Sequence, residues 1–127
     1  MTTRQTIEAY LEALRNGKEW NAFFADNVEF TSFTSPVRTL NGKPAFLEGA
    51  KRFYSSIASM TVRGLLVEGD RGCALTRYQL RSPDGGTFDS DVAEIYSVGD
   101  GRITSFGIYF DTAPYPAPKP APEGVKK

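Results

Sequence analysis

The chain has 127 residues, of which 40% are hydrophobic and 13% aromatic, so we expect one domain with one sizeable core. Its 15 basic and 15 acidic residues give a formal net charge of zero, which does not favour binding to nucleic acid or to an anionic membrane surface. It contains no histidine and a single cysteine, Cys73, which excludes a Ser-His-Asp or Cys-His catalytic set, His-ligated zinc and an internal disulfide.

The location of the protein is predicted from what the sequence lacks. No stretch has the length and apolar character of a membrane span, and residues 1–17 have no apolar signal core. A lone cysteine suits a reducing compartment. We therefore predict a cytoplasmic protein.

The first half of the chain predicts helices interrupted by one strand. Residues 2–15 predict an amphipathic helix, because Ile7, Tyr10, Leu11 and Leu14 recur on one helical face. Residues 18–25 predict a short second helix, and residues 28–34 a short strand. A third helix opens at 42–44, where proline is tolerated in the first turn, and its apolar residues keep helical spacing to residue 57.

From residue 59 onward the pattern is typical of strands. The segments 60–70, 73–82, 87–98 and 102–111 are separated by short turns rich in glycine, which predicts an antiparallel meander. Helices followed by such a meander favour an α+β fold, with the helices packed on one face of a curved sheet.

The end of the chain is rich in proline. Prolines at 114, 116, 118, 120 and 122 exclude a strand and favour an extended segment. We therefore divide the chain into a domain of residues 1–112 and a tail of residues 113–127. The tail is either a solvated extension or a ligand for a proline-recognising partner.

Four segments, in this order, resemble the nuclear transport factor two-like superfamily, and within it the SnoaL-like branch of ketosteroid isomerases, polyketide cyclases and limonene epoxide hydrolases. They are IEAYLEALRNG, FFADNVEF, LNGKPAFLEGAKRFY and GDGRITSFGIYFD, spread over residues 3–112. The resemblance implies a cone-shaped, mostly antiparallel sheet wrapped around three N-terminal helices. It also implies a pocket inside the cone for a small apolar or aromatic ligand and a homodimer formed through the convex face of the sheet. We expect no metal and no cofactor.

The isomerase pattern of this family is only partly matched. Tyr10 matches the oxyanion-hole tyrosine of the first helix, but residues 31–34, where the general base would lie, hold hydroxyl groups and no carboxylate. The second oxyanion acid maps to Ala93, which lies between Asp91 and Glu94. Proton abstraction near neutral pH needs a carboxylate close to the substrate, so most of this machinery is absent.

The epoxide hydrolase pattern is not matched either. Its Asp-Arg-Asp set would fall at Ile108 and near Thr76 and Tyr78, and none of these residues is of the required type. Asp111, at the end of the last strand, therefore belongs either to the rim of the pocket or to a cap on a nearby backbone group.

The hairpin turn predicts which carboxylate faces the pocket. A turn at Asp84-Gly85 sets Tyr78 opposite Asp91, on the face that the family resemblance implies is concave, where burial would raise the pKa of the carboxyl group. A turn at Gly85-Gly86 changes the partners, but the resemblance still implies that Asp91 lies on the concave face. We predict Asp91 as the acid/base, with Tyr10 or Tyr78 polarising the substrate oxygen. The alternative is that Asp89, Asp91 and Tyr78 lie at a wet mouth and take no part in chemistry.

Alternation along the strands assigns further residues to the two faces. The residues predicted to line the pocket are Trp20, Phe30, Ser32, Tyr54, Thr76, Ala93, Phe106, Ile108 and Phe110. Those predicted on the convex, dimer-forming face are Arg77, Gln79, Val92, Glu94, Tyr96 and Val98.

Three functions stay open at this point. The first is a protein that binds a small apolar ligand, with the family's catalytic residues mostly absent. The second is an isomerase, cyclase or dehydratase that uses Asp91 with Tyr10 or Tyr78. The third is a non-catalytic dimerisation module whose cone is filled by its own side chains.

Overall fold

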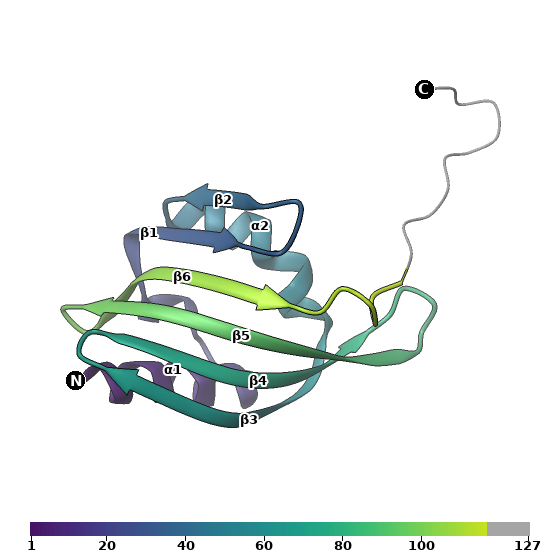
Figure 1. Cartoon of the computed structure of the whole chain (residues 1–127), viewed down its shortest axis with the longest axis horizontal. Coiled ribbons are helices and arrows are strands. Elements are labelled where there is room, and N and C mark those ends of the chain that lie inside the picture. Colours follow the sequence, from purple (N-terminus) through teal and green to yellow (C-terminus); the bar gives the residue numbers. More distant parts are fainter. Residues whose placement is uncertain (117–127) are drawn as a thin grey trace.

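The structure is a computed structural model of the chain, and it describes residues 1–116 (Figure 1). Within them, two α-helices, one 3-10 turn and six strands follow one another. The helical elements are α1 (Thr3–Arg15), η1 (Asn21–Phe23) and α2 (Lys43–Ser56). The strands are β1 (Phe24–Ser32), β2 (Arg38–Asn41), β3 (Ile57–Glu68), β4 (Arg71–Arg81), β5 (Thr87–Gly99) and β6 (Arg102–Phe110). Of the described helices, none is long and apolar enough to cross a membrane.

The two long helices begin and pack as their sequences predict. At the start of α1, the Thr2 side chain accepts a hydrogen bond from the Gln5 amide, and the Gln5 side chain accepts one from the Thr2 amide. Helix α2 starts with a proline in its first turn. The second helix predicted over residues 18–25 is wrong. Only the turn η1 forms, because Phe24 already belongs to β1 and is buried there beside β6.

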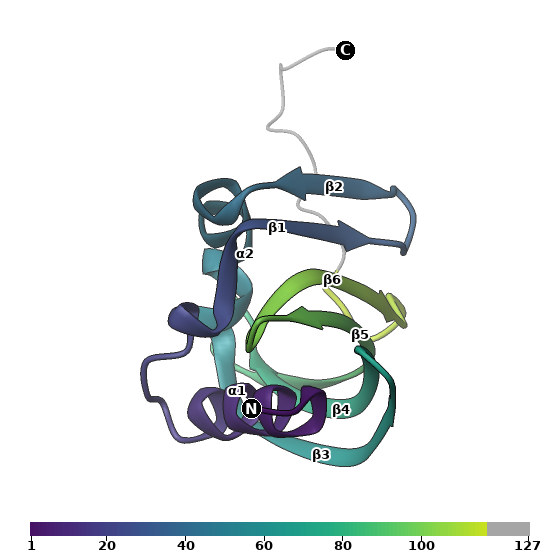
Figure 2. The ribbon, with the colours of Figure 1, turned by 90° about the vertical axis from the view of Figure 1, so that its left-hand side faces the viewer.

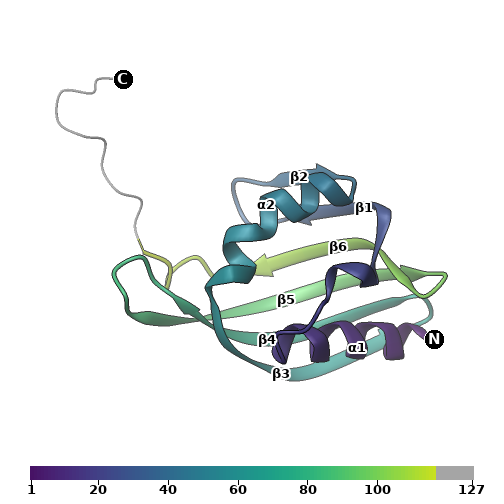
Figure 3. The same ribbon diagram turned by 180° about the vertical axis from the view of Figure 1, so that it is seen from behind.

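The six strands form one sheet in the order β2-β1-β6-β5-β4-β3. The predicted antiparallel meander of β3 to β6 is confirmed, and the short strand β2 was missed. Strand β1 runs parallel to β6, which places Phe30 beside Phe106. The sheet curls, and both helices lie on its concave side (Figures 2 and 3). The predicted α+β cone is confirmed, with two helices inside it instead of three.

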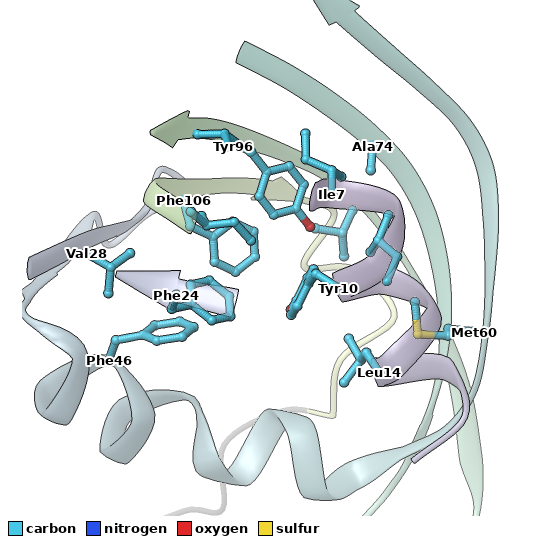
Figure 4. Close-up of a cluster of buried hydrophobic side chains, with 14 of the residues drawn as sticks. Ile7, Tyr10, Leu14, Phe24, Val28, Phe46, Met60, Ala74, Tyr96 and Phe106 are labelled. Atoms are coloured by element: carbon cyan, nitrogen blue, oxygen red, sulfur yellow. The ribbon is translucent and has the colours of Figure 1, made fainter. Parts of the chain in front are cut away.

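The core fills the space between α1 and the concave face of the sheet (Figure 4). Tyr10, fully buried on α1, lies edge-on to Phe24 at 5.1 Å between ring centroids. Phe24 contacts Phe46 of α2 at 4.7 Å, and Tyr96 of β5 stacks on Phe106 of β6 at 4.9 Å. These aromatic contacts hold α1, α2 and the sheet together, because large buried rings contribute much of the apolar area removed from water.

The hairpin between β4 and β5 differs from the predicted one by a single residue. Ser82 and Gly86 close a three-residue loop, in which the Gly85 amide donates to the Ser82 carbonyl at 3.0 Å and Gly85 has a positive φ of 92°. Asp84 accepts from the Gly86 amide at 2.9 Å and stabilises this turn. Three-residue loops of this kind, with glycine in the last position, are common in hairpins.

The extra loop residue reverses the face of β5. Tyr78 pairs with Ser90 and Arg77 pairs with Asp91, so the predicted partners Tyr78 and Asp91 are wrong. A slip of one residue exchanges the two faces of a strand. The inward residues of β5 are therefore Ser90, Val92, Glu94, Tyr96 and Val98, and all of them are buried. The predicted convex set is correct for Arg77 and Gln79 and wrong for Val92, Glu94, Tyr96 and Val98.

Within the described part of the predicted tail, residues 113–116, Tyr115 packs on the sheet. Tyr115 is partly buried, and its ring contacts Phe88 and Phe110 at 4.9 and 5.3 Å. The rest of the predicted tail, residues 117–127, lies outside the described residues.

Candidate functional site

A cavity of about 220 Å³ lies between α2 and the concave faces of β1, β5 and β6. Six of the nine residues predicted to line a pocket lie in its wall: Phe30, Ser32, Tyr54, Phe106, Ile108 and Phe110. Phe46, Phe53, Val92 and Tyr115 add to the apolar lining. Among the described residues of this wall, Glu94 is the single acidic or basic side chain.

The other three predicted lining residues lie elsewhere. Trp20 lies behind Tyr54, with the two rings 4.0 Å apart. Thr76 is buried behind Glu94. Ala93 lies on the convex face of β5, because the register is shifted, and lines a wide, open groove of about 590 Å³ there. That groove is larger than the cavity but is a shallow surface feature, so the cavity is the better candidate site.

Glu94 is fixed by two neighbouring hydroxyl groups of β4. The Thr76 hydroxyl donates to Oε1 of Glu94 at 2.6 Å, and the Tyr78 hydroxyl donates to Oε2 at 2.5 Å. The three side chains meet because β4 and β5 are antiparallel neighbours whose inward residues alternate in step. The side chain of Glu94 is held in one orientation against the cavity, and the residue is 2% exposed.

The surroundings of Glu94 raise its pKa. Burial disfavours the carboxylate and raises the pKa of Glu94 from an ordinary value of 4.5 to about 7, although the hydrogen bonds from Thr76 and Tyr78 oppose this rise. No lysine or arginine of the described chain lines the cavity to compensate the charge. Glu94 can therefore both give and take a proton near neutral pH.

A second polar group of the site is a pair of tyrosines. The hydroxyl groups of Tyr10 on α1 and Tyr54 on α2 lie 2.6 Å apart, and either can be the donor. Tyr54 reaches the cavity wall, whereas Tyr10 lies behind it. Burial raises the pKa of both tyrosines, and the charge of Glu94 adds to this rise. Both hydroxyl groups stay protonated at neutral pH, so Tyr54 can donate a hydrogen bond to a bound molecule.

The three predicted catalytic residues are thus not brought together. Tyr78 donates a hydrogen bond to Glu94 and does not contact Asp91. Tyr10 lies outside the cavity wall, where its hydroxyl group contacts that of Tyr54. Asp91 lies on the convex face with its side chain 54% exposed, and it binds the Arg77 guanidinium through two hydrogen bonds of 2.8 Å. Arg77 lowers the pKa of Asp91, the opposite of the predicted rise. The predicted inward position of Asp91 is therefore wrong.

Two further residues complete the description of the site and its surroundings. Asp111 caps the backbone by accepting from the Ala113 amide at 3.0 Å, which agrees with the capping alternative. Tyr96 is fully buried in the neighbouring core, and its hydroxyl group has no hydrogen-bond partner among residues 1–116. In the same part of the chain, no group of three or more cysteine, aspartate and glutamate side chains is arranged to hold a metal ion.

Glu94 was predicted only as a neighbour of Ala93 and on the convex face, which is wrong. The signal that would have placed it correctly is the sequence Ser82-Pro83-Asp84-Gly85, which suits a type I turn ending in a glycine with positive φ. That loop has one residue more than a two-residue turn, and this difference alone moves Glu94 into the cavity.

Comparisons with known proteins agree with the observed fold. The model of the SnoaL-like domain matches residues 7–106. A solved NTF2-like protein from Burkholderia thailandensis is 20% identical, with a TM-score of 0.76 over 90% of this chain and 94% of its own. A protein from Mesorhizobium loti, provisionally named a SnoaL-like polyketide cyclase and in brackets a carbohydrate phosphatase, is 21% identical, with a TM-score of 0.71 over 86% and 99%. Another provisionally named SnoaL-like polyketide cyclase, from a Jannaschia species, is 15% identical, with a TM-score of 0.72 over 91% and 93%. Among curated proteins, no match was found.

Proposed function

The chain belongs to the SnoaL-like domain family, and from this premise we propose that it binds a small, uncharged aromatic carbonyl compound and moves a proton on it with Glu94. The observation that carries the proposal is a buried carboxyl group with a pKa of about 7 in the wall of an apolar cavity. Strongly shifted carboxyl groups in a cleft are typical of catalytic acids and bases.

The lining of the cavity supports this ligand class. An anionic ligand would be repelled by ionised Glu94, and no cation among the described lining residues would balance it. Aromatic rings surround the space, and its volume of about 220 Å³ suits a compound with one aromatic ring. Two structural neighbours are provisionally named polyketide cyclases, which makes a polyketide-like ketone our first choice of ligand.

The proposed reaction is a proton transfer through an enolate. Ionised Glu94 takes a proton from the carbon next to the carbonyl group, and the electron pair of that C–H bond moves into the enolate. Tyr54 donates a hydrogen bond to the enolate oxygen, while Tyr10 donates to Tyr54. Protonated Glu94 then returns the proton to the same or another carbon. Thr76 and Tyr78 hold the carboxyl group in place for both steps.

Deuterium exchange tests the proposal. Acetophenone is incubated in D2O with the protein, and loss of its methyl proton signal is followed by NMR. We expect saturable exchange that falls about 10²–10⁴-fold in Glu94→Gln. Asp91→Asn, which changes a carboxyl group on the convex face of β5, is the matched control and should keep the full rate. A rate lost in Asp91→Asn and kept in Glu94→Gln would refute the proposal.

A second candidate is ligand binding without turnover. It is supported by residues 31–34, where isomerases of this family carry their general base and this chain carries hydroxyl groups, with Ser32 in the cavity wall. Saturable binding of acetophenone with no exchange above the rate in buffer would favour this function. A dimerisation module with a filled cone is the least supported of the three original functions, given the cavity.

We also propose a homodimer that packs through the convex face. Leu75 and Tyr109 are 45% and 48% exposed there, and Phe33 stacks on Tyr109 at 4.8 Å. Large exposed apolar side chains close together on one face are unusual on a monomer. A solution mass of one chain at all concentrations, or a dimer unaffected by Leu75→Asp, would contradict this interface. The cytoplasmic location stays a prediction made from the sequence.

A further inference from the structure

One side chain of the cavity wall comes from outside the sheet and the helices. Tyr115 lies in the segment Asp111–Pro116, which follows the last strand and lies beyond the residues matched by the SnoaL-like domain. Its neighbours Ala113, Pro114 and Pro116 are exposed, whereas Tyr115 is partly buried and contributes to the cavity wall.

Tyr115 is anchored to the inner face of the sheet. Its hydroxyl group lies 2.8 Å from Oγ of Ser90, a fully buried residue on β5. Its ring lies edge-on to Phe88 of β5 and tilted against Phe110 of β6. Burial raises the pKa of Tyr115, which agrees with this enclosed position.

The backbone of the segment is held mainly by short local bonds. The Ala113 amide donates to Asp111, and the Tyr115 amide donates to the carbonyl of Thr112. Among the hydrogen bonds found for residues 112–116, the one that reaches the sheet is made by the Tyr115 side chain. Tyr115 is therefore the residue that attaches this segment to the sheet, and its ring also forms part of the cavity wall together with Glu94 and Val92.

We propose that Tyr115 is a specificity-determining residue, which limits the length of the aromatic ligand that the cavity accepts. This inference rests on the proposed ligand class and adds the residue that sets its size. The ring occupies the space where a second aromatic ring of a longer ligand would extend past Val92 and Phe110. The contacts with Phe88 and Phe110 hold the ring in that position, and the Ser90 hydrogen bond adds to them.

A comparison of two neutral probes tests the proposal. Dissociation constants of acetophenone, with one ring, and 2-acetylnaphthalene, with two, are measured by calorimetry for each variant. In Tyr115→Ala we expect the affinity for the two-ring probe, relative to the one-ring probe, to rise about 10–100-fold, the range typical of a changed apolar pocket. Tyr115→Leu should give a smaller rise, and it serves as a second test if the alanine variant folds poorly.

Three matched controls make the result specific. Tyr115→Phe keeps the ring and should keep the ratio of the wild-type protein to within about twofold. Tyr109→Ala removes a tyrosine from the convex face and should also leave the ratio unchanged. Glu94→Gln combined with Tyr115→Ala should keep the altered ratio while proton exchange is lost, which separates this inference from the proposed reaction.

An unchanged ratio in Tyr115→Ala and Tyr115→Leu would overturn the proposal, as would an equal rise in Tyr109→Ala. Failure of every protein to bind either probe would overturn it as well, because the cavity would then not accept aromatic ketones of either length.

Discussion

Replacing Glu94 by glutamine should change how the stability of the protein depends on pH. Glutamine keeps the shape of the protonated carboxyl group and its contacts with Thr76 and Tyr78, but it cannot ionise. The pKa of Glu94 is about 7 in the folded protein, against 4.5 as its ordinary value, so the folded state binds a proton that the unfolded state releases between these values. Stability due to this group is therefore full below pH 4.5 and is lost as the pH rises through 7.

The size of the effect follows from the same two values. At about 1.4 kcal/mol for each pH unit, the interval from 4.5 to about 7 corresponds to a loss of about 3 kcal/mol of unfolding free energy in the wild-type protein. The glutamine variant does not have this loss. Its advantage over the wild type should therefore grow by about 3 kcal/mol between pH 4.5 and pH 8, or roughly 10 °C in melting temperature.

Urea unfolding of both proteins at half-unit pH steps measures the difference directly. The contributions of other titrating groups, such as Asp84 and Asp91, cancel in the difference between the two proteins, because both proteins contain these groups. Asp91→Asn is the control, and its difference from the wild type should not grow between pH 4.5 and pH 8. A constant difference between wild type and Glu94→Gln would show that the folded pKa is near 4.5 and would refute the reasoning.

Three further predictions concern the core and the end of the chain. Tyr96→Phe keeps the stack on Phe106 and removes a buried hydroxyl group without a described partner. The free energy of unfolding, measured by thermal unfolding, should therefore rise by about 1 kcal/mol, and a fall of that size would contradict the assignment. Tyr54→Phe leaves the Tyr10 hydroxyl group unpaired and should lower the free energy of unfolding by about 1–3 kcal/mol. Replacing both Tyr10 and Tyr54 by phenylalanine should lower it by less than the sum of the two single changes. A chain ending at Ala113 should melt at a lower temperature than one ending at Pro116, because it lacks the Tyr115 contacts, and equal melting temperatures would contradict this anchor.

The elements that depend on local pattern were predictable from the sequence. Ile7, Tyr10, Leu11 and Leu14 form the buried face of α1, as their spacing predicts. The meander of β3 to β6 follows from apolar runs between glycine turns. By contrast, the aromatic residues of segment 18–25 are compatible with a helix, but this segment forms η1 and the start of β1. The reason is that Phe24 pairs with β6, which is distant in the sequence, so local helix propensity could not predict it.

The candidate site was much less predictable, because it depends on the length of one loop. Whether Asp91 or Glu94 faces the cavity is decided by one residue between Ser82 and Gly86. The raised pKa of Glu94 then depends on burial by α2, β1 and β6 together, which no single segment reveals. Tyr115 was predicted to belong to the tail because prolines flank it, but in the structure its ring packs against Phe88 and Phe110.

The central claim is that the cavity contains an acid/base at Glu94, and its pKa can be measured directly. Protein labelled with ¹³C at the glutamate carboxyl carbons is titrated by NMR from pH 4 to pH 9, and the signal of Glu94 is identified by its disappearance in Glu94→Gln. We predict that this signal titrates with a midpoint near pH 7, the value set by burial in the cavity. A midpoint near 4.5, with the carboxylate ionised throughout the neutral range, would contradict the account.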